Sequence, residues 1–213
     1  GNIVKGRDFI KEYNSEILKF LVLSVHYRSI LNFNQKIINQ TIINLIKIYT
    51  SLNLSNDINN SKVEQKESTE HKKYFTSIEK KLVDFINNDF NTPGMFSILF
   101  DVIRKFNLVS VNKKITPESK SFSLFFIKLF EKYGKILGLF QEQKDAFVEK
   151  LNLLQLKSKK INISELNEKI NVRNKARKNK DYFLSDQIRD ELLTLGIEIK
   201  DNPDGSTGWS VKI

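Results

Sequence analysis

Apolar residues at helical spacing run through the first two thirds of the chain, and two of these stretches open with a Thr-Pro pair. In NTPGMFSILF, Thr92 is placed to cap a helix and Pro93 to occupy its first position; Thr116 and Pro117 repeat the arrangement in ITPESKSFSLFF. Proline suits this position because its φ is fixed and an N–H there would have no partner. The pattern predicts a mainly α-helical protein.

The inward stripes of four such helices predict an antiparallel bundle over residues 35–142. They consist of Ile38, Ile42, Leu45, Tyr49 and Leu52; Ile78, Leu82, Phe85, Ile86 and Phe90; Phe96, Leu99, Phe100, Ile103 and Phe106; and Phe122, Phe125, Phe126, Leu129, Tyr133 and Leu137. We interpret the aromatic stripes as core rather than as a cofactor site. Residues 55–73 are rich in Asn, Ser, Glu and Lys, which predicts a polar surface linker within the bundle.

The last fifty residues have a different pattern. Residues 143–160 lose the strong apolar spacing and are predicted to be a linker. Over 161–213 two amphipathic stretches precede IEIKD and TGWSVKI, which alternate like strands around the turn sequence NPDG. The bundle is therefore expected to be followed by a small α+β domain of two helices and a β-hairpin, with residues 1–34 forming a separate leading segment.

Composition excludes several kinds of site. The chain has no Cys, so disulfides, thiolate zinc sites and cysteine nucleophiles are impossible. Its two histidines, His26 and His71, have no partners at metal-ligand spacing, and no glycine-rich phosphate loop or nucleophile elbow occurs. We assign no catalytic residue and no metal site. The most apolar stretch, 17–25, is too short to span a bilayer, so no membrane partner is expected.

The formal net charge of +10 over 213 residues favours a polyanionic partner. Abundant Lys, Asn and Ile offer another explanation, since codon usage biased toward A and T would give much of the same charge. The chain does not begin with Met, so we expect a fragment of a longer protein.

The basic charge is densest in RNKARKNKDYFLSDQIRDELLTLGIEIKD, residues 173–201. Candidate phosphate-binding residues are Arg173, Lys175, Lys178 and Lys180, joined by Arg177. Tyr182 could stack on an unpaired base; it shares a helix face with Asp186 and Asp190, offset from the core stripe of Leu184, Ile188 and Leu192. These carboxylates either accept hydrogen bonds from base edges or simply offset nearby Lys and Arg on the helix.

Several stretches, in order, resemble cysteinyl-tRNA synthetase downstream of its catalytic domain. RDFIKEYNSEILKFLVLSVHYRSILNFN is similar to the segment after that family's KMSKS loop, and DFNTPGMFSILFD to its DDFNTPEA…LFD stretch in the anticodon-stem (DALR-type) helical bundle. KILGLF resembles the end of that bundle, and residues 173–201 resemble the family's anticodon-reading tail. A sister class I synthetase fits less well, because the tail motif is particular to the cysteine family.

The resemblance implies a class I ligase that joins cysteine to tRNA(Cys) with ATP, its zinc and catalytic motifs lying upstream. This chain alone is then expected to be inactive, to need no cofactor and to act in the cytoplasm as a monomer that binds tRNA(Cys) but not DNA. By position in the family motif, Arg177, Tyr182, Asp186, Asp201 and Trp209 are implied to contact the anticodon. NPDGSTGW is one residue longer than the family's pattern, which affects the placement of Trp209. The alternative is a stand-alone helical protein-interaction module.

Overall fold

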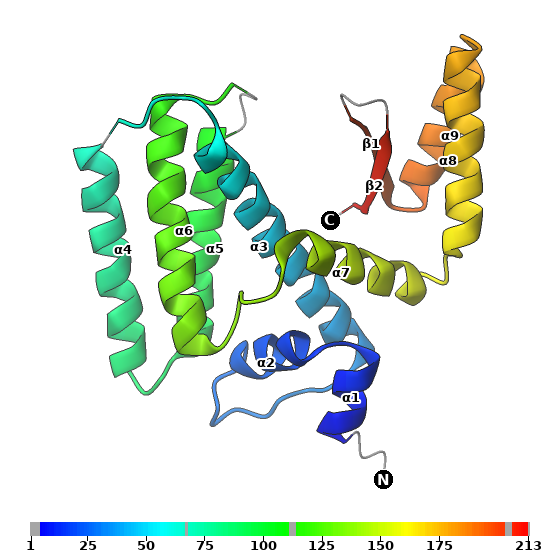
Figure 1. Cartoon of the computed structure of the whole chain (residues 1–213). Coiled ribbons are helices and arrows are strands. Elements are labelled where there is room, and N and C mark those ends of the chain that lie inside the picture. Colours follow the sequence, from blue (N-terminus) through cyan, green and yellow to red (C-terminus); the bar gives the residue numbers. More distant parts are fainter. Residues whose placement is uncertain (1–4, 67, 111–113, 203–205, 213) are drawn as a thin grey trace. The chain divides into compact units, whose positions relative to one another are not determined.

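The computed structural model describes residues 5–66, 68–110, 114–202 and 206–212. They fall into two compact units, Gly1–Val148 and Glu149–Ile213, and the elements of both are labelled in Figure 1. Helices predominate, and the strands among the described residues are confined to the second unit. This confirms the predicted class, a mainly α protein that ends in a small α+β part.

The first unit is a helical bundle. Two short helices, α1 (Gly6–Glu12) and α2 (Ser15–Leu23), lead into α3 (Gln35–Asn60), α4 (Thr69–Asn87), α5 (Thr92–Ser110) and α6 (Pro117–Leu137). Helices α4, α5 and α6 pack against one another, and α3 packs against α6 and α2 (Figure 1). The leading segment 1–34, predicted to be separate, thus contributes helices that belong to the same compact unit as the bundle.

Stacked aromatic rings fill the centre of this bundle, as the sequence predicts. The rings of Phe106 and Phe126 lie 4.4 Å apart between centroids, and those of Phe126 and Phe130 lie 4.6 Å apart. All three side chains are fully buried. Burial of large aromatic side chains is a major source of stability, so these residues are core.

A buried carboxylate joins three parts of the first unit. Glu16 Oε1, on α2, accepts hydrogen bonds from the Tyr49 hydroxyl of α3 at 2.6 Å and from the backbone N–H of Phe140 at 2.8 Å. The Tyr49 oxygen in turn accepts from the N–H of Glu142 at 3.2 Å. Burial raises the pKa of Glu16, and the hydrogen bonds lower it in part.

Three sequence predictions need correction here. Helix α3 continues to Asn60, with Ser55 and Ile58 buried, so the predicted linker 55–73 begins inside a helix. His71 lies buried in α4, with Nδ1 3.1 Å from Ser121 Oγ. At the start of α5 the side chain of Asn91, not of Thr92, accepts the capping bond from Gly94 N–H; the Thr92 hydroxyl donates to the Leu23 carbonyl.

The predicted linker 143–160 is largely a helix, α7 (Lys144–Ser158). Its apolar residues do not form one stripe: Phe147 packs edge-on against Tyr49 in the first unit, and Leu156 belongs to the core of the second. A helix whose apolar residues serve two cores lacks the single-face spacing that identifies amphipathic helices from sequence. The compact second unit accordingly starts at Glu149 rather than at 161.

The second unit contains α8 (Ile163–Lys178), α9 (Tyr182–Thr194) and an antiparallel hairpin of β1 (Ile197–Asp201) and β2 (Thr207–Val211). Asp181 caps α9 by accepting from Leu184 N–H at 3.1 Å, and Gly196 follows its end with φ +76°. The buried core of this unit consists of Leu156, Leu166, Ile170, Ile188, Leu192, Ile197, Ile199 and Val211. Most of the predicted turn NPDG lies outside the described residues.

Candidate nucleic-acid interface

The hairpin register brings the end of β1 to the last turns of α8. Asp201 pairs with Thr207 across the hairpin, and its carboxylate forms ion pairs with Arg173 and Arg177, one turn apart on α8. The connection from α8 to α9 and the end of β1 lie at the same end of this unit in Figure 1. Two predicted anticodon residues, Arg177 and Asp201, are thus in direct contact with each other.

Arg173 holds Asp201 with both arms of its guanidinium. Nη1 donates to Oδ1 at 2.8 Å and Nη2 to Oδ2 at 2.9 Å, a bidentate geometry typical of strong Arg–carboxylate pairs. The Arg173 side chain is only 5% exposed, whereas that of Asp201 is 40% exposed. The prediction of Arg173 as a phosphate-binding residue therefore needs correction, because its charge is engaged inside the unit.

The electrostatics follow from this geometry. Hydrogen bonds from Arg173, with the charges of both arginines, hold the pKa of Asp201 well below its usual range. The same bonds raise the pKa of Arg173. Asp201 is therefore an ionised acceptor at any physiological pH, presented at a surface that is otherwise rich in positive charge.

Three predicted phosphate-binding residues are exposed where α8 ends and α9 begins. Lys175 and Lys178 lie in the last turn of α8, and Lys180 follows with a left-handed φ of +61°. Cations at a helix C-terminus are stabilised by the helix dipole, so part of this charge also serves the helix. Their exposure leaves them available to a polyanion.

Two aromatic side chains stand in solvent at the start of α9. Tyr182, predicted to stack on a base, is 62% exposed, and its neighbour Phe183 is 83% exposed. The sequence analysis missed Phe183, although it lies off the core stripe that begins at Leu184. An aromatic residue beside a basic run and outside the apolar stripe is the signal that could have identified it.

The remaining candidates separate into one surface residue and one partly buried residue. Asp186 is exposed on α9, one turn after Tyr182. Trp209 is partly buried on β2, opposite Ile199, and packs against the core of the unit. Trp209 contributes to the core here, which the family motif alone did not indicate.

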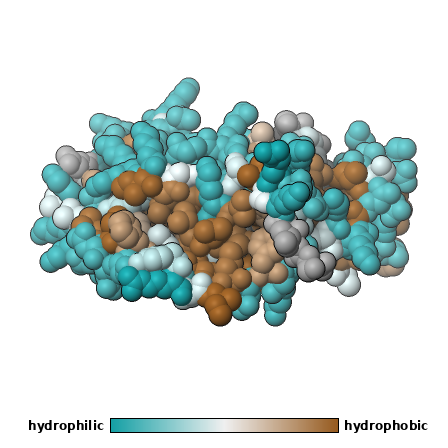
Figure 2. Space-filling model, turned by 90° about the horizontal axis from the view of Figure 1, so that it is seen from below, coloured by the Kyte–Doolittle hydropathy of each residue, from teal (hydrophilic) through white to brown (hydrophobic). Residues whose placement is uncertain are grey.

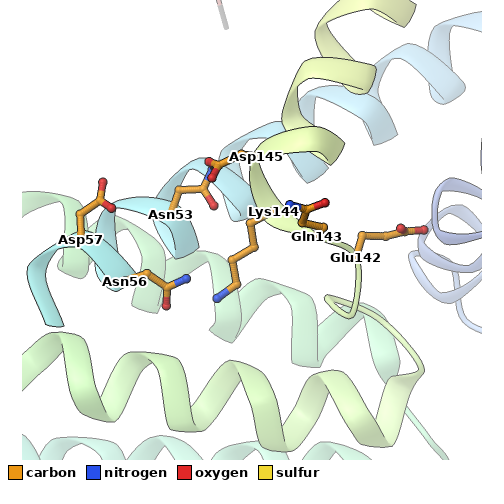
Figure 3. Close-up of a pocket in the computed structure, with 7 residues that line it drawn as sticks. All are labelled: Asn53, Asn56, Asp57, Glu142, Gln143, Lys144 and Asp145. Carbon is orange, nitrogen blue, oxygen red and sulfur yellow. The ribbon is translucent and has the colours of Figure 1, made fainter. Parts of the chain in front are cut away.

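A polar hollow of about 330 Å³ lies in the first unit, between α3 and the start of α7. Asn53 donates to Asp145 at 2.7 Å across it, and Lys144 extends from α7 toward Asn56 (Figure 3). Burial lowers the pKa of Lys144. The lining amides and carboxylates form helix-to-helix contacts and include no nucleophile paired with a base.

An apolar groove of about 320 Å³ lies where α2 meets the ends of α4, α5 and α6. Phe90, 67% exposed and with φ +50°, and Ile136, 58% exposed, lie on its rim. Figure 2 views the molecule from the side on which these helix ends lie and shows apolar side chains gathered on that face. Beside it, the Tyr27 hydroxyl donates to Asp89 at 2.6 Å, and Arg28 Nε lies 3.2 Å from the same carboxylate.

The described residues offer little for metal or membrane binding. Within the part of the chain that the structure describes, no group of three or more His, Asp or Glu side chains is arranged to hold a metal ion. None of the described helices combines the length and apolarity needed to cross a membrane.

Comparison with known proteins identifies related sequences. The family model of the DALR domain matches residues 81–141, which cover the end of α4, all of α5 and α6, and the segment after α6. The cysteine–tRNA ligase of Bdellovibrio bacteriovorus is 34% identical over 212 residues, 99% of this chain. This chain is homologous to part of cysteine–tRNA ligase. The similarity extends beyond the bundle into the second unit, because it covers almost every residue.

Two further relatives support the assignment. The cysteine–tRNA ligases of Maridesulfovibrio salexigens and Thermodesulfovibrio yellowstonii are each 32% identical over 216 residues, 99% and 100% of this chain. The chain spans 44% of the length of each of the three relatives. The matched region is therefore less than half of each of these ligases.

Proposed function

We propose that this chain is the tRNA-binding region of a cysteine–tRNA ligase and that its second unit reads the anticodon of tRNA(Cys). The DALR-domain bundle would lie along the anticodon stem. Its N-terminal helices, α1 and α2, would contribute to the same stem contact. Arg177, Tyr182, Asp186 and Asp201 would face the anticodon, and Lys175, Lys178 and Lys180 its phosphates.

One observation carries the proposal: the end of the second unit combines the three chemistries that single-stranded RNA requires. Exposed Lys residues provide phosphate contacts, Tyr182 and Phe183 provide stacking surfaces, and Asp186 and Asp201 provide acceptors for base N–H groups. A carboxylate among phosphate-binding lysines weakens phosphate binding by repulsion. That cost is offset when the carboxylate accepts a hydrogen bond from a base N–H group. The cysteine anticodon, GCA, supplies such donors on guanine and cytosine.

The specificity test uses two RNA stem-loops that differ only in the anticodon, GCA against a scrambled triplet. The chain should prefer the GCA loop, and Asp186→Ala or Arg177→Ala should reduce that preference by about 1–3 kcal/mol for each base interaction removed. Asp190→Ala, an exposed acid one turn further along α9, is the matched control and should keep the preference. Equal binding of both loops by the unmutated chain would refute anticodon reading.

The charge test separates the lysines from the base contacts. Replacing Lys175, Lys178 and Lys180 by Ala should weaken both loops alike. It should also flatten the dependence of log K on log salt by about 0.7 for each phosphate that the protein no longer neutralises. Replacing Lys150, Lys159 and Lys160, three exposed residues that precede α8, is the control for total charge and should leave the salt slope unchanged. An unchanged salt slope in the triple variant would place the phosphate contacts elsewhere.

The activity of the parent protein belongs to the same proposal: an ATP-dependent ligase that attaches cysteine to its tRNA. The zinc that the resemblance implies does not fit this chain, because it has no Cys and its described residues offer no metal-binding group. ATP and zinc would then act in the part of the relatives that this chain does not span. The chain alone should not form cysteinyl-tRNA.

The apolar groove favours a second candidate function, docking of a protein segment on the first unit. Exposed Phe90 and Ile136 give it an apolar rim of the kind that often marks protein contacts. Phe90→Ser should leave the binding of the GCA loop unchanged if tRNA is read by the second unit. Size-exclusion chromatography with and without tRNA distinguishes the two functions. Formation of a complex with tRNA supports the first function, and the absence of such a complex favours the second.

A further inference from the structure

The Oδ2 atom of the Asp201 carboxylate is saturated with donors in this structure. Oδ1 accepts from Arg173 Nη1 and lies 3.2 Å from the Thr207 hydroxyl; Oδ2 accepts from Arg173 Nη2 and from Arg177 Nη1. Each carboxylate oxygen offers about two lone-pair positions, so the two arginine arms fill those of Oδ2. A base N–H can therefore bond to Oδ2 only if one of these two arginine arms leaves.

The two arginines differ sharply in how easily they can leave. Arg173 is 5% exposed and bonded through both arms, so breaking its pair would strand a charge away from water. Arg177 is 44% exposed and contributes a single arm. Ion pairs that are open to solvent are weak, because water solvates the two groups when they separate.

The Thr207 hydroxyl is a less suitable leaving donor than Arg177. Its single hydrogen lies within reach of two acceptors, Asn174 Oδ1 at 3.0 Å and Asp201 Oδ1 at 3.2 Å, so it is not on Oδ2 and need not leave when a base binds there. Thr207 is moreover the backbone partner of Asp201 in the hairpin. The weakest link at the carboxylate is therefore the Arg177 arm on Oδ2.

We propose that Arg177 is an exchangeable occupant of the base-reading position on Asp201, and that Arg173 is the positioning residue that holds the carboxylate during the exchange. The inference rests on the proposed function. A base edge that carries an N–H donor takes the Oδ2 position, and the freed Arg177 guanidinium turns to a phosphate or to a base acceptor. A base without that donor leaves the Arg177–Asp201 pair closed, so the exchange itself contributes to discrimination.

Arginine side-chain NMR of the intact chain tests the exchange directly. With the GCA stem-loop as probe, the Arg177 guanidinium signals should shift and those of Arg173 should keep their positions and slow rotation about Nε–Cζ. If the loop binds and the Arg177 signals stay, or the Arg173 signals move instead, the exchange is wrong while the proposed function stands. If fluorescence anisotropy shows no binding of the loop, both fail.

The same conservative substitution at the two arginines supplies matched variants. Lysine cannot form the bidentate fork but keeps the charge. Arg173→Lys should therefore reduce the preference for GCA over a loop in which inosine, lacking the 2-amino donor, replaces guanosine, from about tenfold to about onefold. Arg177→Lys should keep that preference within about twofold.

A stability control separates positioning from folding. Both variants should be measured at a temperature where Trp209 fluorescence reports a folded second unit. If Arg173→Lys retains discrimination there, Arg173 does not position the carboxylate. If that variant does not fold, the shift of the Arg177 signals in the unmutated chain decides the proposal alone.

Discussion

Each unit of the molecule contains a carboxylate that holds several segments together. The two carboxylates differ in exposure, in the charge of their donors and in the direction of their pKa shifts. Glu16 in the first unit is 3% exposed and is bonded by a tyrosine hydroxyl and a backbone N–H. Asp201 in the second unit is bonded by two arginines and keeps a side chain that is 40% exposed. Burial raises the pKa of Glu16, and the arginines lower that of Asp201.

The difference separates a structural acid from one that can bind a ligand. A carboxylate with neutral donors and no route to water can only join its neighbours. A carboxylate that is ionised, half exposed and held from behind by a buried cation presents negative charge without depending on the ligand to neutralise it. Of the two acids, Asp201 alone combines fixed geometry with a partly exposed carboxylate, whose Oδ2 becomes available to a base edge when Arg177 leaves.

Asp201→Ala should give the largest effect, because it leaves the buried Arg173 charge without its partner. We expect a loss of about 3 kcal/mol in the stability of the second unit, at the low end for a broken buried pair since Asp201 itself is partly exposed. Trp209 is the only tryptophan, so its fluorescence in urea unfolding follows this unit. Asp186→Ala, the control, should change the stability of the second unit by less than about 0.5 kcal/mol. Equal effects of the two would mean that Arg173 does not need Asp201.

Tyr49→Phe tests the buried acid of the first unit. It removes one donor from Glu16 and the acceptor of the Glu142 N–H, which should cost about 2 kcal/mol. In urea unfolding, the loss should appear in the transition followed by the helical circular dichroism signal. The transition followed by Trp209 fluorescence, which reports the second unit, should not move. Tyr27→Phe, which removes an exposed hydroxyl bonded to Asp89, is the matched control and should cost far less.

The pH dependence of stability should differ in sign between the two acids. The folded pKa of Glu16 is raised, so its contribution is full below the unfolded value of 4.5 and is lost as pH rises through the folded pKa. The folded pKa of Asp201 is lowered, so its contribution is present above the unfolded value of 3.8 and is lost as pH falls toward the folded pKa.

Glu16→Gln isolates the contribution of Glu16 to the pH dependence of stability. The amide oxygen can accept from both Tyr49 and Phe140, which bond the same oxygen of Glu16, so these bonds are kept while the titrating charge is removed and Oε2 becomes an NH2 group. Unfolding measured from pH 4 to pH 7 should show that this variant loses less stability than the unmutated chain as pH rises. Parallel curves would mean that Glu16 titrates as an exposed acid does.

The helices could be predicted from sequence because capping and periodicity are local. Thr116 forms the predicted cap, closed as a capping box with Ser119, and Phe96, Phe106, Phe122 and Phe126 are buried as expected. Phe90 was wrongly predicted to face inward: it lies beyond the end of α4 and is 67% exposed. The errors arose where tertiary contacts decide: Ser55 and His71 are polar residues satisfied inside the bundle by Ser123 and Ser121. A polar composition indicates a surface only when the side chains have no partners in the fold.

The family motif names the residues of the candidate site but not how they pair. Arg177, Tyr182, Asp186 and Asp201 were named from the family motif, and the structure exposes all four. Hairpin register decides which residue of α8 meets Asp201, and register depends on a turn that the sequence only partly specifies. Arg173 was therefore predicted to face phosphate, whereas it lies behind the carboxylate.

The smallest effect is expected at the Arg28–Asp89 pair, which has the same chemical groups as the Arg173–Asp201 pair but little burial. The side chains of Arg28 and Asp89 are 70% and 41% exposed, and Arg28 Nε lies 3.2 Å from Asp89 Oδ2. Arg28→Ala should therefore change the stability of the first unit by no more than about 0.5 kcal/mol, because exposed pairs are solvated whether or not they form. Urea unfolding followed by circular dichroism measures it. A loss as large as that of Asp201→Ala would show that burial of the arginine is not what separates the two pairs, and the positioning role of Arg173 would lose its physical basis.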